Sequence, residues 1–264
     1  MKLGFAAPVS LHLLRHLVKD GDQLPPGYLF APSADWIQAL MRLGHHVTVY
    51  TTDTQTALPR TYHGEGLTIR IAPARANGCG RDLFAAERRY LWKMMMEDRC
   101  EVIHAHWTYE FALAALATGI PTLVTIHDLP WNVLWHFRDM HRAARLLMAY
   151  QVARRGKYFT AVSTDAAVHF QRYLRPRARI QVIPNGLPEG IFSLGEGLPA
   201  KRRDGITFAT ILQGWSRRKN ATAALRAFGK VRAELPDARL LMFGMDYEQG
   251  GTAHKWALQK KLDA

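Results

Sequence analysis

The sequence predicts an α/β fold with a complete doubly wound parallel sheet, followed by the first βαβα part of a second sheet. Short apolar runs alternate along the chain with segments of helical periodicity. Most of these runs are apolar on both faces, which is typical of parallel strands covered by helices on both sides. After a stretch rich in Gly, Pro and basic residues, the alternation starts again. We therefore expect a domain at 1–195, a linker at 196–204 and an incomplete domain at 205–264.

The first half of the chain opens on a strand. The apolar run KLGFAA at 2–7 predicts a buried strand rather than a signal peptide, because basic residues and histidines interrupt the stretch that follows. The next 25 residues, 8–32, are expected to form a loop long enough to suggest a binding role. Ser33 is predicted to cap a helix that Gly44 ends. Further strands are expected at 45–51, 67–73 and 101–106, with a helix at 82–97.

The alternation continues to the end of the first domain. A helix, a strand and a long helix are expected in turn at 109–119, 121–128 and 131–155. The run YFTAVS at 158–163 predicts a strand whose last residue, Ser163, caps the following helix. A final strand, RIQVIPNG at 179–186, runs into a turn.

The second domain repeats the pattern over about 60 residues, a length that gives only a marginal core. Its parallel strands are expected to leave an open edge. The expected elements are a strand at 205–212, a helix at 220–234, a strand at 238–244 and a helix at 252–262.

The chain is strongly basic, with 35 Lys and Arg against 22 Asp and Glu. Nucleic acid, an anionic membrane and a phosphate-bearing small molecule all fit such a charge. The basic residues are spread over several elements without a recognised binding fold, which argues against nucleic acid. No apolar stretch is long enough to span a membrane, and Cys79 and Cys100 match neither a disulfide nor a metal pattern. We expect a reduced, cytoplasmic protein with no metal.

Polar residues gather where the predicted strands end. His106 and Trp107 stand at the end of one expected strand, and His127 and Asp128 end the next, whereas His104 lies inside its strand and is expected to be structural. In open α/β sheets, ligands bind beyond the carboxyl ends of the strands. No GxGxxG follows the first strand, which argues against a dehydrogenase, and HExxH, GxxxxGK[ST] and GxSxG are also absent.

Three segments carry a more specific signal: HAHWTYEFALAALATGIPTLVTIHD at 104–128, VIPNGLPEGIF at 182–192, and ILQGWSRRKNATAALRAFGKVRAELPDARLLMFG at 211–244. Their order and spacing resemble those of glycosyltransferase family 4 over nearly the whole chain. The resemblance implies the GT-B fold, in which two Rossmann-like domains face each other across a cleft. It further implies a retaining transfer of sugar from a nucleotide-diphosphate sugar to a glycan or lipid-linked acceptor, without a metal or other cofactor.

The resemblance also implies site residues on the acceptor side. His127 corresponds to the histidine that ends the TxHD strand of the family, near the sugar and the bond that breaks. An imidazole there can donate a hydrogen bond to a sugar hydroxyl or to developing charge, although tying the strand end to a loop is the alternative. Asp128 either orients His127 or caps the following turn. His106 and Trp107 are expected to line the acceptor cleft. Gly27 takes the place of a double glycine in the first long loop, and a turn glycine with no ligand role is the alternative.

On the donor side, Lys219 is the clearest candidate. It precedes a helix that Asn220 is predicted to cap, and a lysine beside a helix N-terminus suits a diphosphate. A solvated lysine on a basic loop is the alternative. The family has a Gly-Arg pair shortly before this lysine; here Gly214 lacks the adjacent arginine, and Arg217 or Arg218 is expected to replace it. The other residues expected at the donor are Asn185 and Gly244.

An expected pair of acidic residues is missing from the sequence. Family members carry two glutamates separated by seven residues in the second half of the donor domain, and no two glutamates of this chain have that spacing. The strands that would bear the pair are not in the sequence either. We therefore expect the 264 residues to be truncated within the donor domain and inactive by themselves.

Two other functions and one partner stay open. The chain could be a non-catalytic fragment that binds an acceptor or a partner, or another GT-B enzyme such as a sugar-nucleotide epimerase. The expected helix at Trp131–Lys157 carries five arginines among aromatic and aliphatic residues. It could lie peripherally on the anionic inner face of a membrane. A helix that covers the sheet and keeps its basic face in water is the favoured interpretation.

Overall fold

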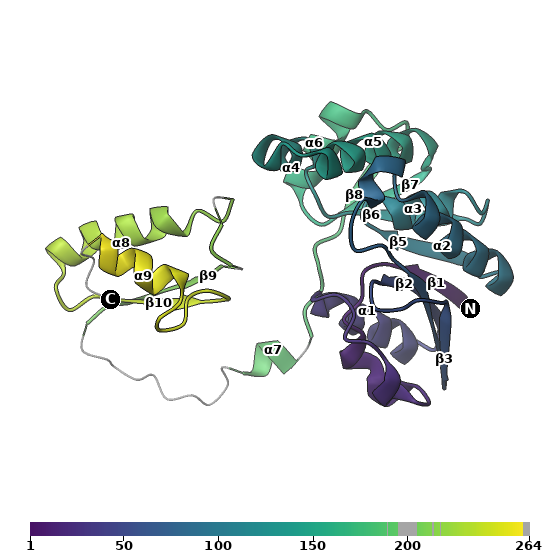
Figure 1. The fold of residues 1–264 in the computed structure, drawn as a ribbon, viewed down its shortest axis with the longest axis horizontal. Coiled ribbons are helices and arrows are strands. Elements are labelled where there is room, and N and C mark those ends of the chain that lie inside the picture. The colour runs from purple at the N-terminus through teal and green to yellow at the C-terminus, as the bar shows by residue number, and fades with distance from the viewer. Residues whose placement is uncertain (189, 195–204, 213, 217, 261–264) are drawn as a thin grey trace. The chain divides into compact units, whose positions relative to one another are not determined.

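A computed structural model describes residues 1–188, 190–194, 205–212, 214–216 and 218–260. The chain divides into two compact units, Met1–Leu194 and Gly195–Ala264 (Figure 1). Among the described residues, the first unit has a sheet of eight strands and the second a sheet of two. The α/β class predicted from the sequence is confirmed.

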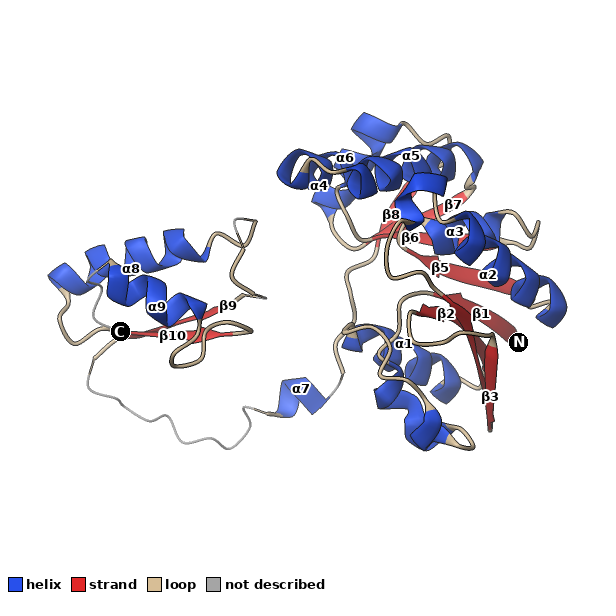
Figure 2. Ribbon diagram, viewed as in Figure 1, coloured by secondary structure: helices blue, strands red, loops and turns tan. Residues whose placement is uncertain are grey.

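The eight-stranded sheet has the order β3-β4-β2-β1-β5-β6-β7-β8. All neighbouring strands are parallel except β3 and β4, and helices lie on both sides of the sheet (Figure 2). The strands are β1 Lys2–Ala6, β2 His46–Asp53, β3 Arg60–Gly64, β4 Leu67–Pro73, β5 Val102–His106, β6 Thr122–Ile126, β7 Tyr158–Ala161 and β8 Ile180–Val182.

The sequence did not predict β3, which pairs antiparallel with β4 at the edge of the sheet. Tyr62 is the one buried residue of this strand, and its hydroxyl donates a hydrogen bond to the Gln23 carbonyl at 3.0 Å. An edge strand with a single buried side chain lacks the continuous apolar run that identifies the central parallel strands. No element was therefore predicted for these residues.

The helices of the first unit cover two separate hydrophobic clusters, because successive residues of a strand point to opposite faces of the sheet. Phe5 belongs to the cluster that includes α1 and η1, and Ala6 belongs to the cluster that includes α2, α3, α5 and α6. The helices are η1 Leu11–Leu17, η2 Gly21–Gln23, α1 Ala31–Arg42, η3 Cys79–Asp82, α2 Ala85–Asp98, α3 Glu110–Leu116, α4 Pro130–Phe137, α5 Met140–Arg155, α6 Thr164–Leu174 and α7 Gly190–Ser193.

Of the two predicted serine caps, one is confirmed and the other is wrong. Ser163 caps α6, since its Oγ accepts a hydrogen bond from the Ala166 N–H at 3.1 Å. Ser33 instead lies inside the first turn of α1, where its Oγ donates to the Phe30 carbonyl at 2.8 Å. Pro32 favours the earlier start, because its fixed φ suits a first helical turn and it has no N–H to satisfy there.

The long helix expected at 131–155 is two helices, α4 and α5. Arg138 ends α4 in the left-handed conformation, with φ of 48°. Asp139 then caps α5 by accepting a hydrogen bond from the Arg142 N–H at 2.8 Å. The local signal for this new start was the aspartate itself, a preferred N-cap residue.

The loop after β1 is held to the end of that strand by hydrogen bonds. Ser10 Oγ donates to the Tyr28 carbonyl at 2.6 Å and accepts from the Phe30 N–H at 2.8 Å. The Tyr28 N–H donates to the Val9 carbonyl at 2.9 Å. The far end of the loop, and α1 after it, therefore return to the carboxyl edge of the sheet.

The second unit has the predicted βαβα order: β9 Thr207–Ile211, α8 Ala221–Glu234, β10 Arg239–Phe243 and α9 Thr252–Gln259. The two strands are parallel and their side chains are mostly exposed. The buried apolar side chains among its described residues are all alanines, namely Ala221, Ala238, Ala253 and Ala257. Burial of such small side chains contributes little, so this unit has a thin core by comparison with the first.

Steric constraints favour glycine at position 27, in the loop after β1. Its φ is 71°, in the left-handed region that favours glycine. A Cβ atom at this position would lie 2.3 Å from the Val9 carbonyl oxygen and 2.9 Å from Leu11 Cγ. Glycine is therefore needed here for the path of the chain, independently of any contact with an acceptor.

We predict that Gly27→Ala lowers the free energy of unfolding of the first unit by about 1–3 kcal/mol, because a side chain there is strained in φ and clashes with backbone. Urea denaturation followed by circular dichroism measures the loss. Gly44→Ala is the matched control, since Gly44 has φ of 80° but no described heavy atom within 4 Å of its Cβ position. If the two variants lose equal stability, the contact with Val9 has no energetic weight.

Candidate functional site

Two histidines meet at the carboxyl edge of the first sheet. His106 is the last residue of β5 and pairs in register with Thr125 of β6, and His127 follows β6 directly. Residues two apart on a strand share a face, so His127 lies on the same side of the sheet as Thr125 and His106. The Nδ1 atom of His106 is 3.0 Å from the Nε2 atom of His127. The structure thus joins two residues that the sequence assigned to this edge.

Three aromatic rings surround His127. Trp107 stacks on it with ring centroids 4.4 Å apart, Trp36 of α1 lies at 5.9 Å in a stacked orientation, and Phe30 meets it edge-on at 6.0 Å. Trp107 has φ of 64°, a left-handed conformation that costs a non-glycine residue about 1–2 kcal/mol. This turn of the backbone coincides with the stacking of the Trp107 ring on His127.

The histidines of this cluster are held neutral near pH 7. Burial, with a smaller effect of His104, lowers the pKa of His127 to about 4. Burial also lowers the pKa of His104 to about 4, and together with the two neighbouring histidines it holds the pKa of His106 well below its usual range. Each neutral imidazole has one N–H donor and one acceptor nitrogen. The pair can therefore share a hydrogen bond without any charge.

His104 contacts side chains of the sheet, which is consistent with the structural role expected for a residue inside the strand. Its Nε2 atom is 2.7 Å from Thr125 Oγ, which is in turn 2.7 Å from Thr160 Oγ on β7. These contacts link three adjacent strands through one partly buried and two buried polar side chains. No hydrogen bond joins His104 to His127 among the described residues.

Asp128 makes neither of the contacts proposed for it. Its Oδ2 atom accepts a hydrogen bond from the Tyr109 hydroxyl at 3.1 Å, and α4 begins without a side-chain cap. The Arg145 guanidinium lies over the Tyr109 ring at 4.9 Å. Asp128 is thus tied to the loop after β5, whereas the partner of His127 is the histidine of β5.

His106 lies deeper than expected for a residue that lines a cleft. It is 3 % exposed, whereas Trp107 and His127 are half-buried and keep part of their surface open. Gly27, the remaining acceptor-side residue, belongs to the same loop as Phe30. Phe30 and Trp36 were not predicted from the sequence, because only the return of the loop to the sheet edge brings them to His127.

A second polar group near this edge was also missed. Glu110 opens α3 and is buried, and burial raises the pKa of its carboxyl against the opposing effect of Arg145. Glu110 Oε2 and Arg145 Nε are both buried without a hydrogen-bond partner among the described residues. The only signal in the sequence was the position of Tyr109 and Glu110 within the segment at 104–128, shortly after Trp107.

The donor-side candidates lie in the second unit, apart from Asn185, which is exposed after β8 of the first. The Lys219 N–H donates to the Ser216 carbonyl at 3.1 Å in the turn before α8. Asn220 occupies the cap position with φ of 52°, but its side chain does not cap the helix, contrary to prediction. Arg218 is exposed, and Arg217 lies outside the described residues.

Two glycines of the second unit have clear backbone roles. Gly244 follows β10 with φ of 137°, and a Cβ atom there would lie 1.8 Å from the Leu212 carbonyl oxygen. The Gly214 carbonyl accepts a hydrogen bond from the Tyr247 hydroxyl at 3.0 Å. Glycine at 244 therefore allows the loops after β9 and β10 to approach closely.

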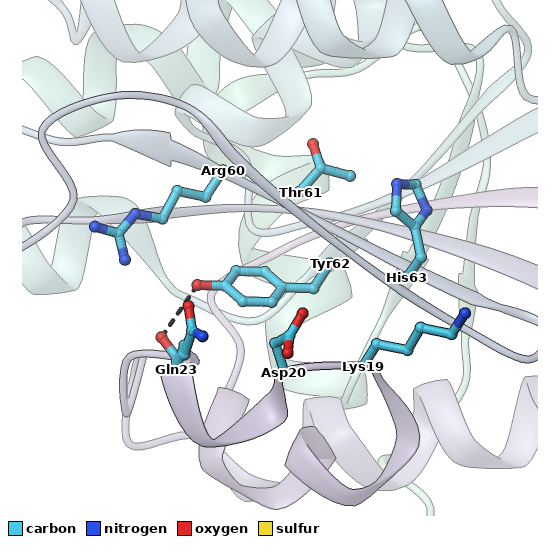
Figure 3. A pocket seen from close by; sticks show the side chains of 7 residues that line it. All are labelled: Lys19, Asp20, Gln23, Arg60, Thr61, Tyr62 and His63. Carbon is cyan, nitrogen blue, oxygen red and sulfur yellow. Dashed lines mark hydrogen bonds between the residues drawn. The ribbon is translucent and has the colours of Figure 1, made fainter.

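Two cavities in the described part of the chain are lined by neither His106 nor His127. One of about 450 Å³ lies beside β3, where the Tyr62 hydroxyl points to Gln23 (Figure 3). Its lining residues are Lys19, Asp20, Gln23, Arg60, Thr61, Tyr62 and His63. Another of about 680 Å³ lies among α8, β10 and α9 of the second unit. No group of three His, Cys, Asp or Glu side chains suited to a metal ion occurs in the described part of the chain.

Comparison with known proteins places this arrangement in a family. Residues 34–189 match the family described as Glycosyltransferase Family 4. A D-inositol 3-phosphate glycosyltransferase from Stackebrandtia nassauensis is 24% identical over 242 residues, which span 81% of this chain and 54% of that protein. The chain thus spans about half the length of this curated relative.

Solved structures share the fold at low sequence identity. The sucrose-phosphate synthase of Thermosynechococcus elongatus is 14% identical, with a TM-score of 0.65 over 99% of this chain and 68% of the other. The Escherichia coli trehalose-6-phosphate protein bound with UDP-2-fluoro glucose is 11% identical, with a TM-score of 0.58 over 99% and 68%. The α/β fold is of the GT-B type, as the resemblance implied. The family match covers more than half of the chain, including both histidines together with Trp36 and Trp107, and the chain belongs to Glycosyltransferase Family 4.

Proposed function

We propose that this chain is the acceptor-binding part, with the opening of the donor-binding part, of a retaining glycosyltransferase. The enzyme transfers sugar from a nucleotide-diphosphate sugar to a glycan or lipid-linked acceptor. The observation that carries this proposal is the neutral His127, backed by His106 and framed by Trp107, Trp36 and Phe30 at the carboxyl edge of the sheet. Family membership favours this function over a sugar-nucleotide epimerase.

The chemistry of the framed histidine suits a sugar. A neutral imidazole donates or accepts a hydrogen bond with a hydroxyl, and flat indole rings bury the apolar C–H faces of a pyranose. A hydrogen bond from His127 to a sugar hydroxyl, or to the oxygen that gains charge as the glycosidic bond breaks, stabilises the transition state more than the ground state. His127 is therefore assigned the catalytic role, and Trp107 a role in holding sugar.

The proposed donor site includes basic residues at the N-terminus of α8. Lys219 stands immediately before the cap position of α8, a helix of 14 residues whose free N–H groups and dipole favour an anion. Arg218 adds a second cation to this turn. We assign the diphosphate of the donor to these groups, and we assign Gly214 and Gly244 to close approach of backbone to the nucleotide. A structural relative that holds UDP-2-fluoro glucose supports a nucleotide sugar as donor.

The role of His127 is tested in a chimera that joins residues 1–204 to the complete donor domain of a family member. We expect His127→Ala to lower turnover about 10²–10⁴-fold, the range for loss of one positioned polar or proton-transferring group. His104→Ala is the control, because His104 bonds to Thr125 instead. Steady-state rates with UDP-sugars measure the effect, and unchanged turnover in His127→Ala would return this residue to a structural role.

Residues 1–264 expressed alone are predicted to give no measurable sugar transfer. Positioning of reactants can contribute about 7–11 kcal/mol, and it needs a rigid donor site. In its described residues, the second unit has a two-stranded sheet and buries only alanines among its apolar side chains, so we also expect its amides to exchange faster than those of the first unit. Transfer assays with several nucleotide sugars and hydrogen-exchange mass spectrometry provide the measurements.

Clear turnover by the purified monomer would contradict this prediction. It would place the whole reaction on residues of the first unit and on the Lys219 turn. Binding of acceptor without turnover would instead agree with the non-catalytic fragment considered above. The first unit has two well-filled hydrophobic clusters and is expected to fold and bind in either case.

A membrane partner is proposed on the surface of α4. Trp135 is 70% exposed and Met140 80%, and Trp131 and Phe137 are also exposed. The Arg138 guanidinium lies 4.5 Å from the centre of the Trp135 ring. Exposed aromatic rings beside arginines suit the interface of an anionic bilayer. None of the described helices is both long and apolar enough to cross a bilayer.

Helix α5 covers the sheet, and an arginine of its first turn contacts an exposed aromatic side chain of α4. This helix packs on the sheet through buried residues such as Met148 and Val152, so the sheet-covering interpretation holds for it. Arg142, at its first turn, lies 4.6 Å from the centre of the Phe137 ring of α4. The surface proposed for the membrane is therefore α4 with the start of α5, rather than one long basic helix.

We expect the chain to bind vesicles that contain phosphatidylglycerol and to bind neutral phosphatidylcholine vesicles much more weakly. The double change Arg138→Gln and Arg142→Gln should weaken binding about thirtyfold, since each surface cation contributes about 1 kcal/mol. Arg42→Gln, on α1, is the matched control. Vesicle sedimentation at low and physiological salt measures the affinity, and equal binding by all variants would assign this surface to another partner or to water.

A further inference from the structure

His106 faces the interior of the first unit, under His127. It is 3 % exposed, and its ring lies against Phe5 at 4.6 Å and His104 at 4.1 Å between ring centroids. Trp36 stacks on it at 4.9 Å with an angle of 16° between the ring planes. Packing on three sides fixes the orientation of this imidazole, so a substrate has little access to it.

The two nitrogen atoms of His106 have different surroundings. Nδ1 is 3.0 Å from His127 Nε2. Nε2 is buried and has no hydrogen-bond partner among the described residues. His127 is half-buried, and its Nδ1 atom makes no hydrogen bond in the described part of the chain and is not among the buried unpartnered atoms. One nitrogen of His127 is therefore committed to His106 and the other is available.

Two neutral imidazoles can share this hydrogen bond in only two ways. If His127 Nε2–H donates, the proton of His106 is on its buried Nε2, and an N–H is left without a partner. If His106 Nδ1–H donates, the buried Nε2 carries only a lone pair. Orphaned buried N–H groups are rarer in folded proteins than under-satisfied acceptors, so the second arrangement is favoured. It requires the proton of His127 to be on Nδ1.

We propose that His106 is a positioning residue, whose Nδ1–H donates to His127 Nε2 and so holds His127 in the tautomer with its proton on Nδ1. This inference rests on the function proposed above, in which His127 contacts the sugar. His127 then presents an N–H donor, from its available nitrogen, to a sugar hydroxyl or to the oxygen that gains charge. The burial that lowers the pKa of both histidines keeps the pair neutral and the arrangement intact near pH 7.

Nitrogen NMR on the 264-residue chain tests the tautomer without any need for turnover. In ¹⁵N-histidine-labelled protein, protonated and bare ring nitrogens resonate far apart, and the spectrum of His127→Gln identifies the signals of His127. We expect the wild type to show Nδ1 protonated and Nε2 bare at His127. His106→Leu should abolish this single form and give a mixture of tautomers at His127.

Two further variants separate the hydrogen bond from packing. His106→Asn places an amide N–H near the position of Nδ1 and should keep His127 protonated on Nδ1, which also covers the case in which His106→Leu does not fold. His104→Leu removes a neighbouring imidazole with no hydrogen bond to His127 and should leave the tautomer unchanged. Thermal unfolding of each variant reports whether the first unit is folded.

The NMR experiment tests the role of His106 independently of the proposed function. A His127 protonated on Nε2 in the wild type, or an unchanged tautomer in folded His106→Leu, would overturn the role of His106. Failure of the proposed function would appear elsewhere, as unchanged turnover of the chimera with His127→Ala. If the tautomer behaves as expected, His106→Leu in the chimera should lower kcat at least tenfold with little change in KM for the acceptor, and His106→Asn should recover most of it.

Discussion

The parallel register of β5 and β6 is the constraint on which the candidate site depends. It pairs His106 with Thr125 and so carries His127 to the same face, within hydrogen-bond distance of His106. A shift of one residue would turn Thr125 and His127 to the opposite face of the sheet and break both contacts. The link from His104 through Thr125 to Thr160 opposes such a shift, because three strands would lose a buried hydrogen bond together.

The aromatic frame depends on this register in turn. β1 lies between β2 and β5, so the loop that leaves β1 ends beside the histidines of β5. The hydrogen bonds of Ser10 with Tyr28 and Phe30 hold that loop, and Gly27 allows its turn. Trp107, with its strained backbone, completes the frame by stacking on His127. A residue kept in an unfavourable conformation needs well-packed surroundings, and the central strands supply them.

The two units differ in how much of this support they have. The first unit buries aromatic and branched side chains on both faces of its sheet, whereas the described core of the second consists of alanines. The candidate site residues of the two units are therefore held with different rigidity. The pair formed by His106 and His127 is preorganised by packing, but Lys219 lies on a turn before a helix that is itself weakly anchored.

The sequence by itself determined the α/β class, the central strands and the strand ends at which His106 and His127 stand. The bounds of the strand expected at 67–73 agree with β4. Buried parallel strands have nearly continuous apolar sequences, which can be recognised without knowledge of the tertiary structure. The resemblance to the family was likewise confined to contiguous segments. The prediction of one helix at 131–155 failed, because a left-handed Arg138 and an Asp139 cap outweighed a helical pattern that continues across them.

Only the tertiary structure decided which of the edge residues touch. It placed His106 beneath His127 rather than in a cleft, gave Asp128 to Tyr109, and brought Phe30 and Trp36 to a histidine about 90 residues further along the chain. It also revealed β3, a strand without a continuous apolar run that is held in the sheet by its antiparallel pairing with β4. These contacts depend on strand register, loop path and burial, which are properties of the packed sheet and are not encoded in the spacing of residues along a single segment.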